Sequence, residues 1–365
     1  MSDGFSLSSY IINKTNLINN CLTIKSKLSP NTKLCAVVKS DAYGVGAGVV
    51  SKIIYPFVDE YAVANLKEGI QLRRTIKDKP IIVLAPTICA RFAYYAKHNL
   101  IMVVSKIEDA KYLAQNADVP ISVELKIDSG MHRFGFCNFK ELLEAESILK
   151  TNENINIVGL YSHLATKEND VLFMLKQKAK FGSIVDEFLA ETNTNLEVHI
   201  SNSNAAIMHP DFNYDMVRVG FGLYGMDNKF GLKPVVEIKT KLVNIKKIKK
   251  GESVGYNRTF VAPSDMTIGV VPLGYADGIN RRLSNVGFFI IDGARCKIVG
   301  NVCMDVCMVD LTPIKAPKLY SEAVFLGRQK NESISLEEIA ILAGTSEYDI
   351  LTGLRSKRMK RRIKA

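Results

Sequence analysis

The sequence predicts a (β/α)8 TIM-like barrel followed by a mostly β C-terminal domain. Between residues 30 and 225, eight short apolar runs alternate with longer stretches of helical spacing. Strands separated by helices pair in parallel through right-handed crossovers, and eight such units close into a barrel. After residue 230, short apolar runs are joined by Gly, Asp and Asn turns, which is typical of β structure. We therefore expect a barrel domain over residues 1–229 and a β domain over residues 230–365.

The elements of the first domain follow from apolar periodicity. A helix is expected over Tyr10–Leu28, ahead of the first strand. The eight strands are expected at Leu34–Val38, Glu60–Ala64, Pro80–Leu84, Leu100–Val104, Ile121–Lys126, Asn156–Tyr161, Leu196–Ile200 and Met216–Val219. The helices between them include Leu66–Arg74, Lys106–Gln115, Phe139–Leu149 and Val171–Leu189. An open doubly wound sheet is the alternative, but it favours a glycine-rich dinucleotide loop after the first strand, and no GxGxxG motif occurs there.

The second domain is expected to contain six strands and one helix. The strands are expected at Lys239–Ile248, Met266–Pro272, Gly287–Ile291, Cys296–Val299, Met308–Leu311 and Ala323–Leu326. The helix is expected at Leu336–Leu342, with Ser333 or Ser335 as its N-cap and two glutamates in its first turn.

Composition excludes several classes of protein. Of the 365 residues, 47% are hydrophobic and 23% are charged, which suits a globular protein with a sizeable core. No apolar run approaches the ~18 residues that a membrane helix needs, and the first residues lack the features of a secretory signal. The seven scattered cysteines include no CxxC pair, which indicates free thiols and not a disulfide scaffold or metal site. We expect a cytoplasmic protein that binds no metal and no membrane.

Basic residues gather in two runs, and the formal net charge is +11. The runs are Lys246–Lys250 and Arg355–Lys364. Such runs can bind phosphate backbones, although more often they are solvated faces or frayed chain ends. Because no recognised nucleic-acid motif accompanies them, we expect no nucleic-acid partner.

Lys39 closes the first apolar run and opens a turn. A lysine at the end of a buried strand loses water, which favours a neutral, nucleophilic amine. Such an amine can form a Schiff base with a carbonyl cofactor such as pyridoxal 5′-phosphate (PLP). Taken alone, the residue more often would be a lysine whose charge reaches solvent beyond the strand.

Further polar residues follow other predicted barrel strands, where the chemistry of such barrels is located. They are Lys126 and Arg133 after the fifth strand, His163 after the sixth, His199 and Ser203 at the seventh, and Arg218 in the eighth. Each has an ordinary structural interpretation, such as a core histidine, a rim ion pair or a turn serine. Their coincidence at one rim predicts a functional site.

Five short segments, taken in order, resemble the alanine racemases. They are Ala36–Gly44 (AVVKSDAYG), Leu125–Met131 (LKIDSGM), Met216–Arg218 (MVR), Gly274–Gly278 (GYADG) and Cys303–Asp305 (CMD). The resemblance covers roughly residues 30–355 and implies a PLP enzyme that interconverts L- and D-alanine by a two-base mechanism, supplying D-alanine for peptidoglycan. It also implies a homodimer with shared active sites and a small-molecule amino-acid substrate.

The resemblance implies that Lys39 holds PLP and exchanges protons on one face of the substrate Cα. Tyr256 of the second subunit would act on the opposite face. Because a phenol is a poor base at its usual pKa, nearby cations would have to favour its phenolate, and His163 would contact both the cofactor ring and Tyr256. Taken alone, Tyr256 would be a half-buried strand tyrosine.

Arg218 matches the arginine that faces the pyridine nitrogen. Since arginine keeps its proton, it would donate to this nitrogen, limit electron withdrawal and suppress transamination. His199 resembles the residue that orients this arginine, or else is a buried strand-end histidine bonded to backbone. Arg133 matches the arginine that binds the cofactor phenolic oxygen near the substrate carboxylate. Lys126, carbamylated in many family members, would orient Arg133 or remain an ordinary lysine.

The remaining matches concern the phosphate and substrate access. The phosphate would be held by Tyr43, Ser203, the backbone N–H groups of Gly220 and Phe221, and Tyr348. Tyr275 and Tyr348 would narrow the path of the substrate. Met304 would contact the substrate through its backbone from the second subunit, and the carboxylate of its neighbour Asp305 is available for local orientation.

The sequence departs from the family pattern at Val45, where a histidine is common, at Ser203-Asn204, where Ser-Ala is more usual, and in its basic C-terminus. Three alternatives stay open. A serine-preferring racemase tends to carry a smaller polar residue at the position of Tyr348, and a broader-specificity racemase of the periplasm carries a secretion signal. A non-catalytic PLP-binding protein usually lacks the second domain. A decarboxylase of similar architecture uses glutamate where this chain has Arg218.

Overall fold

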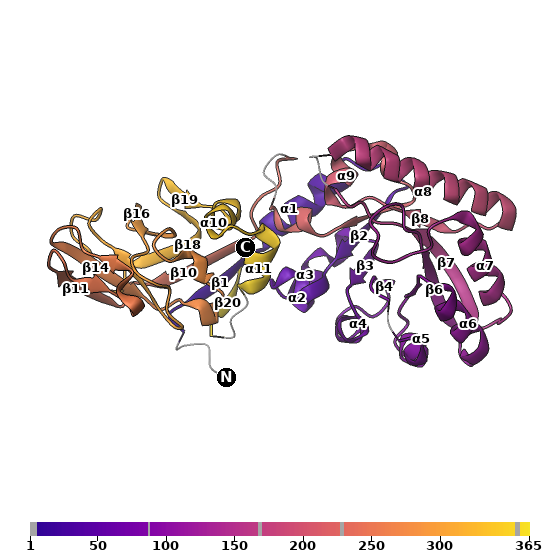
Figure 1. Ribbon diagram of the computed structural model, residues 1–365, viewed down its shortest axis with the longest axis horizontal. Helices are drawn as coiled ribbons and strands as arrows, with labels where there is room; N and C mark the ends of the chain where they lie inside the picture. The colour runs from indigo at the N-terminus through magenta and orange to yellow at the C-terminus, as the bar shows by residue number, and fades with distance from the viewer. Residues whose placement is uncertain (1–5, 87, 167–169, 227–229, 355–357) are drawn as a thin grey trace.

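The computed structural model describes residues 6–86, 88–166, 170–226, 230–354 and 358–365. Figure 1 shows a barrel surrounded by helices at one end of an elongated molecule and a β-rich unit at the other. Parallel strands in the first unit and mainly antiparallel strands in the second confirm the predicted fold class.

All eight predicted barrel strands are present. They are β2 (Lys33–Val37), β3 (Glu60–Val63), β4 (Ile81–Val83), β5 (Met102–Val104), β6 (Ile121–Lys126), β7 (Ile155–Tyr161), β8 (Glu197–His199) and β9 (Met216–Val219). They form two four-stranded parallel sheets, in the orders β4-β3-β2-β9 and β5-β6-β7-β8. A parallel bridge between Ile82 and Ile101 joins the sheets on one side. On the other side, the N–H of Arg218 donates to the carbonyl oxygen of Ser201 at 3.0 Å, so the ring closes.

Helices cover the outside of the barrel (Figure 1). They are α3 (Ala47–Ile54), α4 (Leu66–Arg73), α5 (Phe92–Lys97), α6 (Ile107–Asn116), α7 (Phe139–Leu149), α8 (Val171–Thr192) and the short α9 (Ser203–Met208). Sequence periodicity did not predict α3, because the glycines at 44, 46 and 48 resemble a loop. Gly46 has a φ of 115° and ends the turn, and the helix begins at the next residue.

The prediction of one helix over Tyr10–Leu28 is wrong for its first residues. The structure has a strand, β1 (Ser9–Asn13), and then α1 (Lys14–Lys25). The side chain of Asn13 accepts a hydrogen bond from the N–H of Asn16 at 2.9 Å and caps the helix. The partners of β1 are distant in sequence, so local periodicity could not reveal the strand.

The second unit contains a seven-stranded sheet, a three-stranded sheet and a short hairpin. The seven-stranded sheet has the order β16-β15-β18-β10-β1-β20, with β19 paired to β18, and the three-stranded sheet has the order β11-β14-β17. The bounds are β10 (Val236–Lys241), β11 (Asn244–Ile248), β12 (Ser253–Val254), β13 (Phe260–Val261), β14 (Met266–Val271), β15 (Phe288–Ile291), β16 (Ala294–Lys297), β17 (Cys307–Asp310), β18 (Glu322–Gln329), β19 (Glu332–Ile334) and β20 (Lys360–Lys364).

Two predictions for this unit are corrected. The single strand expected at Lys239–Ile248 is divided into β10 and β11, because the chain passes from one sheet to the other at the buried Leu242. The basic tail, interpreted as a solvated face or frayed end, is not frayed from Lys360 onward, because it forms strand β20 parallel to β1; the last four residues of this strand are exposed, as a solvated face would be. Arg355, Ser356 and Lys357 of this run lie outside the described residues.

Two helices complete the second unit, α10 (Leu336–Ala343) and α11 (Glu347–Gly353). The Ser335 hydroxyl accepts a hydrogen bond from the N–H of Glu338 at 3.1 Å, which identifies Ser335 as the N-cap of the predicted helix. Figure 1 shows α11 at the junction of the two units, beside α2 (Lys39–Tyr43). The helix therefore brings Tyr348 to the barrel.

One hydrophobic core runs through both units, from barrel residues such as Leu34 to Phe325 and Leu351 of the second unit. The predicted division after residue 229 adjoins residues 227–229, which lie outside the described part, and it stays a prediction. That division counts β1 with the barrel, although β1 lies in the sheet of the second unit. Among the helices of the described residues, none combines the length and apolar character needed to cross a bilayer.

Candidate active site

Lys39 stands at the C-terminal end of β2, at the start of a left-handed turn. The four residues that follow it all have positive φ, between 53° and 56°. This conformation costs an L-residue roughly 1–2 kcal/mol, so such a run persists only where the surroundings fix it. The N–H of Ser40 donates to Oε1 of Glu68 at 3.1 Å, and the N–H of Ala47 donates to Oδ1 of Asp41 at 2.8 Å. The turn is therefore held by carboxylates at both ends.

The Lys39 amine lies in a site that favours its neutral form. Burial lowers the pKa of Lys39 below its usual range, and the positive charges of Arg133 and Arg218 lower it further, against a smaller opposing effect of Glu68. Lys39 thus has the electrostatic character of a nucleophile. This does not fit the alternative of a lysine whose charge simply reaches solvent.

A cavity of about 310 Å³ opens at the C-terminal ends of the barrel strands, where Lys39 lines it. This volume lies within the range of small-ligand sites. Eight of the residues predicted from sequence line it together: Lys39, Tyr43, His163, Ser203, Arg218, Gly220, Phe221 and Tyr348. Lys126 and His199 are buried behind this lining, and Arg133 is exposed beside it.

Arg218 is buried in the barrel and its guanidinium is fixed by carbonyl and histidine partners. Nη2 donates to the carbonyl oxygen of Ser162 at 2.6 Å, and Nη1 lies 2.5 Å from Nδ1 of His199. Nη2 also lies 3.4 Å from Nδ1 of His163. The guanidinium sits over the ring of Tyr161, 5.1 Å from its centroid. Arg218 therefore presents a fixed cationic donor to the cavity.

His199 is fully buried, and its ring lies between the guanidinium of Arg218 and the carboxylate of Glu124. Burial and the charge of Arg218 hold its pKa well below the usual range, so the ring is neutral. Because Nδ1 faces a guanidinium donor, we assign the ring proton to Nε2, which lies 3.3 Å from Oε1 of Glu124. Both ring nitrogens thus face side chains, which favours the orienting role over a backbone-bonded core histidine. His163 is neutral for the same reasons, since burial and Arg218 hold its pKa well below the usual range.

Lys126 is almost fully buried at the end of β6, with its amine 4.3 Å from the centroid of the Tyr161 ring. Burial, together with the charges of Arg218 and Arg133, lowers the pKa of Lys126 to about 7. A sizeable neutral fraction therefore exists near neutral pH. The following turn is shaped by Asp128, whose carboxylate accepts hydrogen bonds from the N–H groups of His132 and Arg133, both at 3.1 Å.

Another part of the cavity wall is formed by Ser203 and the backbone of Gly220 and Gly222. Ser203 Oγ accepts hydrogen bonds from the N–H of Gly220 at 3.1 Å and of Gly222 at 3.2 Å. A Cβ at Gly220 would lie 2.4 Å from the Tyr43 hydroxyl, so a larger residue there would displace the Tyr43 ring. The ring centroids of Phe221 and Tyr348, which both line the cavity, lie 4.6 Å apart, with the ring planes tilted by 32°. Hydroxyls, a glycine backbone and nearby cations form a cradle whose chemistry fits a phosphate.

Three further predicted residues are exposed and do not line this cavity: Tyr256 and Met304, which are expected to act from a second subunit, and Tyr275, which is expected to narrow the substrate path. Tyr256, Tyr275 and Met304 are 70%, 45% and 53% exposed. Tyr256 lies in a short 3-10 turn, not in a strand, so the alternative of a half-buried strand tyrosine is wrong.

Hydrogen bonds tie the three exposed loops into one surface. Asn301 Nδ2 donates to the carbonyl oxygen of Tyr256 at 2.9 Å, and the N–H of Tyr275 donates to that of Cys303 at 3.0 Å. A Cβ at Gly274 would lie 2.3 Å from the carbonyl oxygen of Met304, which explains the glycine of this motif.

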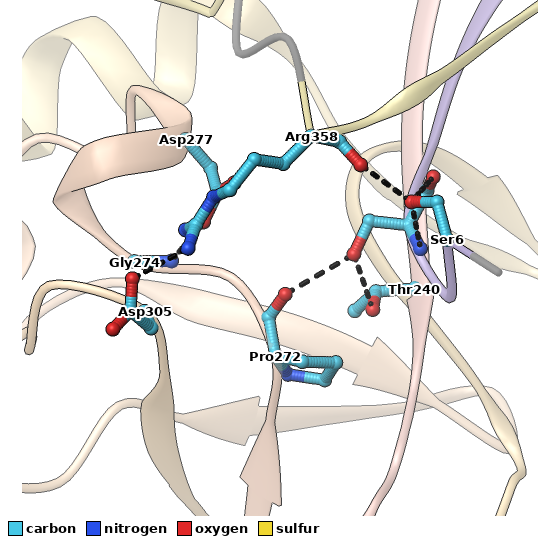
Figure 2. Close-up of polar contacts among 8 residues, drawn as sticks. Ser6, Thr240, Pro272, Gly274, Asp277, Asp305 and Arg358 are labelled. Atoms are coloured by element: carbon cyan, nitrogen blue, oxygen red, sulfur yellow. Dashed lines mark hydrogen bonds and ion pairs between the residues drawn. The ribbon is translucent and has the colours of Figure 1, made fainter. Parts of the chain in front are cut away.

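Arg358 of the tail braces this surface, as Figure 2 shows. Nη2 contacts Oδ2 of Asp277 at 2.6 Å, Nε contacts Oδ1 of the same carboxylate at 3.2 Å, and Nη1 contacts Oδ1 of Asp305 at 2.5 Å. Asp277 is buried and also accepts a hydrogen bond from the N–H of Gly274 at 2.9 Å. Arg358 thus links the loop of Tyr275 to the loop of Met304.

Sequence reasoning missed several residues of the site. Met131, Asn202 and Gly222 also line the cavity. The sequence signal for Asn202 is that asparagine is a preferred N-cap residue, and its side chain does cap α9. Glu124 carried a signal too, as a carboxylate inside a predicted barrel strand. In the residues described, no cluster of three His, Cys, Asp or Glu side chains is arranged to hold a metal ion.

Comparison with known proteins agrees with this geometry. The profile of the alanine racemase N-terminal domain matches residues 12–228, and that of the alanine racemase C-terminal domain matches residues 235–363. The chain belongs to the alanine racemase family. The resemblance indicated by the sequence motifs is thereby confirmed.

Individual alanine racemases are similar over nearly the whole chain. That of Thermodesulfovibrio yellowstonii is 36% identical over 360 residues, covering 96% of both proteins. The crystal structure of alanine racemase from E. faecalis superposes with a TM-score of 0.93 at 29% identity and covers 100% of both chains. The Bartonella henselae alanine racemase, whose structure contains covalently bound pyridoxal phosphate, superposes with a TM-score of 0.88 at 27% identity and covers 98% of this chain and 99% of its own.

Proposed function

We propose that this chain is a PLP-dependent alanine racemase that interconverts L- and D-alanine. The observation that carries the proposal is the placement of Lys39, with its lowered pKa, in one cavity with Arg218 and the Ser203–Gly220 cradle. We further propose that the enzyme is a cytoplasmic homodimer and that its D-alanine supplies peptidoglycan synthesis.

The residues of the cavity fit the cofactor at both ends. Lys39 would hold PLP covalently through its amine. Tyr43, Ser203, Gly220, Phe221 and Tyr348 would hold its phosphate. Arg218 would donate to its pyridine nitrogen, and Arg133, which is exposed beside the cavity, would donate to its phenolic oxygen.

Two proton carriers of this family would act on opposite faces of the substrate. When bound, PLP withdraws electrons from the substrate Cα and makes its proton acidic. The amine of Lys39, whose pKa is lowered by burial and by the charge of Arg133, would take or return the proton on one face. Tyr256 of the second subunit takes or returns it on the other face. Arg218 would keep its own proton and donate a hydrogen bond to the pyridine nitrogen, which would limit the electron withdrawal that the cofactor supplies.

Exposure of three loop residues supports the homodimer. Tyr256, Tyr275 and Met304 form a partly apolar surface, and such a surface marks an interaction site on a soluble protein. Seated on a second copy, it would bring Tyr256 to the partner's Lys39. Met304 would then contact the substrate through its backbone, and Asp305 would be oriented by Arg358.

Tyr348 supports alanine over serine as the substrate. Its ring packs on Phe221 and lies 5.9 Å from the ring of Tyr43, which narrows the cavity. A smaller polar residue there would leave room for a hydroxymethyl group. Arg218 stands where a decarboxylase would have a glutamate, and the second unit distinguishes the chain from non-catalytic PLP-binding proteins.

The test is chiral chromatography of PLP-loaded protein incubated with L-alanine in D2O. We expect D-alanine that carries deuterium at Cα. The Lys39→Ala and Tyr256→Phe variants should each lose this conversion. Conversion of serine but not alanine would change the substrate, and bound PLP without exchange in any amino acid would refute the enzymatic proposal.

A further inference from the structure

The basic tail reaches the turn that carries Lys39. Arg361 of β20 lies 320 positions after Asp41 in sequence, and its Nη2 contacts Oδ2 of Asp41 at 3.3 Å. The same nitrogen donates to the carbonyl oxygen of Gly44 at 3.0 Å. The guanidinium therefore connects the beginning of the left-handed turn to its end.

The two oxygens of the Asp41 carboxylate have different partners. Oδ1 accepts the N–H of Ala47, which starts α3, and Oδ2 receives Arg361. The carboxylate is thus the point where the turn, the next helix and the tail meet. The space is tight, because a Cβ at Gly46 would lie 2.9 Å from Nη1 of Arg361.

Strand pairing sets the position of Arg361. In the parallel pairing of β1 and β20, Arg361 stands opposite Tyr10. Its guanidinium lies 5.9 Å from the centroid of the Tyr10 ring, which is buried. Figure 1 shows β1 and β20 at the junction of the two units, next to α2. The register of the sheet therefore delivers this side chain to the Lys39 turn.

We propose that Arg361 is a positioning residue for Lys39, which it serves by holding the left-handed turn in the form that directs the amine into the cavity. The proposal rests on the proposed function for its catalytic consequence. Removing the guanidinium leaves Asp41 and Gly44 without a common donor, so the turn can relax toward the right-handed conformation that L-residues prefer. Lys39, as the residue that begins the turn, then loses its fixed direction.

The test compares Arg361→Ala and Arg361→Lys with Arg362→Ala in the full-length protein. Arg362 is the matched control, because it is exposed on the same strand and alternation places its side chain on the opposite face. Hydrogen exchange of the peptide that spans Lys39–Ala47 reports on the turn itself. Borohydride trapping of PLP on Lys39, titrated with PLP, reports on the direction of the amine. The kcat and KM for L-alanine and the thermal midpoint complete the set.

We expect Arg361→Ala to speed exchange in this peptide and to weaken PLP retention about 3- to 10-fold, the range of a partly exposed charge-assisted contact. The kcat should fall by a similar factor with KM nearly unchanged. Arg361→Lys should recover part of each effect, and Arg362→Ala should match the unaltered protein.

Two results would overturn the proposal. One is an Arg361→Ala variant that matches Arg362→Ala in exchange and PLP trapping. The other is an Arg361→Ala variant with a lower thermal midpoint but unchanged trapping and kcat, which would show a purely structural role. If the unaltered protein fails to racemise alanine, the proposed function fails, while the exchange and trapping measurements still decide the role of Arg361.

Discussion

Nη1 of Arg218 lies 2.5 Å from Nδ1 of His199, and both side chains are buried inside the barrel. Arg218 in addition donates to the carbonyl oxygen of Ser162. These contacts fix both the position and the charge of the group that we expect to face the pyridine nitrogen.

Replacing Arg218 by lysine should therefore cost activity even though the positive charge remains. An ammonium cannot reach the histidine and the carbonyl together in this geometry, and a lost charge-assisted hydrogen bond costs about 1.5–3 kcal/mol. We expect kcat to fall about 10- to 100-fold, as measured by steady-state kinetics at saturating PLP. Arg74→Lys, on the exposed side of the barrel, is the control, and an Arg218→Lys enzyme with full kcat would contradict the role of the arginine.

Lys126 should make the stability of the apo protein depend on pH. Burial with Arg218 and Arg133 nearby lowers its pKa from 10.5 to about 7. Between these values the unfolded chain binds a proton that the folded chain does not, so the free energy of unfolding rises with pH. Below about pH 7 Lys126 is protonated in both states, so the destabilising cost of its buried charge is then fully present. Urea unfolding at about pH 6 and about pH 9 measures the difference. Lys126→Met should reduce it, whereas Lys111→Met, an exposed change, should not; equal pH dependence in both variants would refute the assignment.

Two inactive variants should restore activity when mixed, if the sites are shared between subunits. A heterodimer of Lys39→Ala and Tyr256→Phe chains would hold one site with both residues intact. Reassembly after mild denaturation should return activity toward about a quarter of the unaltered level, as random pairing of a symmetric dimer requires. Each variant treated alone is the control. If no activity returns although size-exclusion chromatography shows mixed dimers, Tyr256 and Lys39 do not meet across an interface.

Loss of Arg358 should loosen the surface that carries Tyr275 and Met304. Arg358→Ala leaves the buried Asp277 carboxylate without its guanidinium partner, and we expect the free energy of unfolding to fall by about 1–3 kcal/mol. The dimer should also dissociate more readily in sedimentation experiments. Arg362→Ala serves as the comparison from the same tail, and the interpretation of Arg358 as a brace would be wrong if the two variants behaved alike.

The local pattern of apolar and polar residues was sufficient to predict the barrel and the position of many of its site residues. Each apolar run contained the information for a strand, and the C-terminal ends of parallel strands meet at one rim. Lys39, His163 and Arg218 therefore came together as the sequence predicted. The roles of these residues stay predictions.

Features that depend on distant contacts could not be predicted. The residues Ser40–Tyr43 have no intrinsic preference for the left-handed region, and contacts with Glu68 and the tail hold them there. Strand β1 has too few residues to be distinguished from a helix start without its partners. The tail displays only charge in the sequence, since the carboxylates that Arg358 contacts lie 53 and 81 positions away and the one that Arg361 contacts lies 320 positions away.

The position of β20 has a consequence for solubility. This strand forms one edge of the seven-stranded sheet, and an exposed edge can pair with the edge of another molecule. Four of its five residues are lysine or arginine, so like-charge repulsion between two such edges opposes their pairing. A chain that ended before Lys360 would instead present β1 as the edge, with the apolar residues Tyr10, Ile11 and Ile12 in a row. The same basic strand that reaches the Lys39 turn therefore also protects the protein against aggregation.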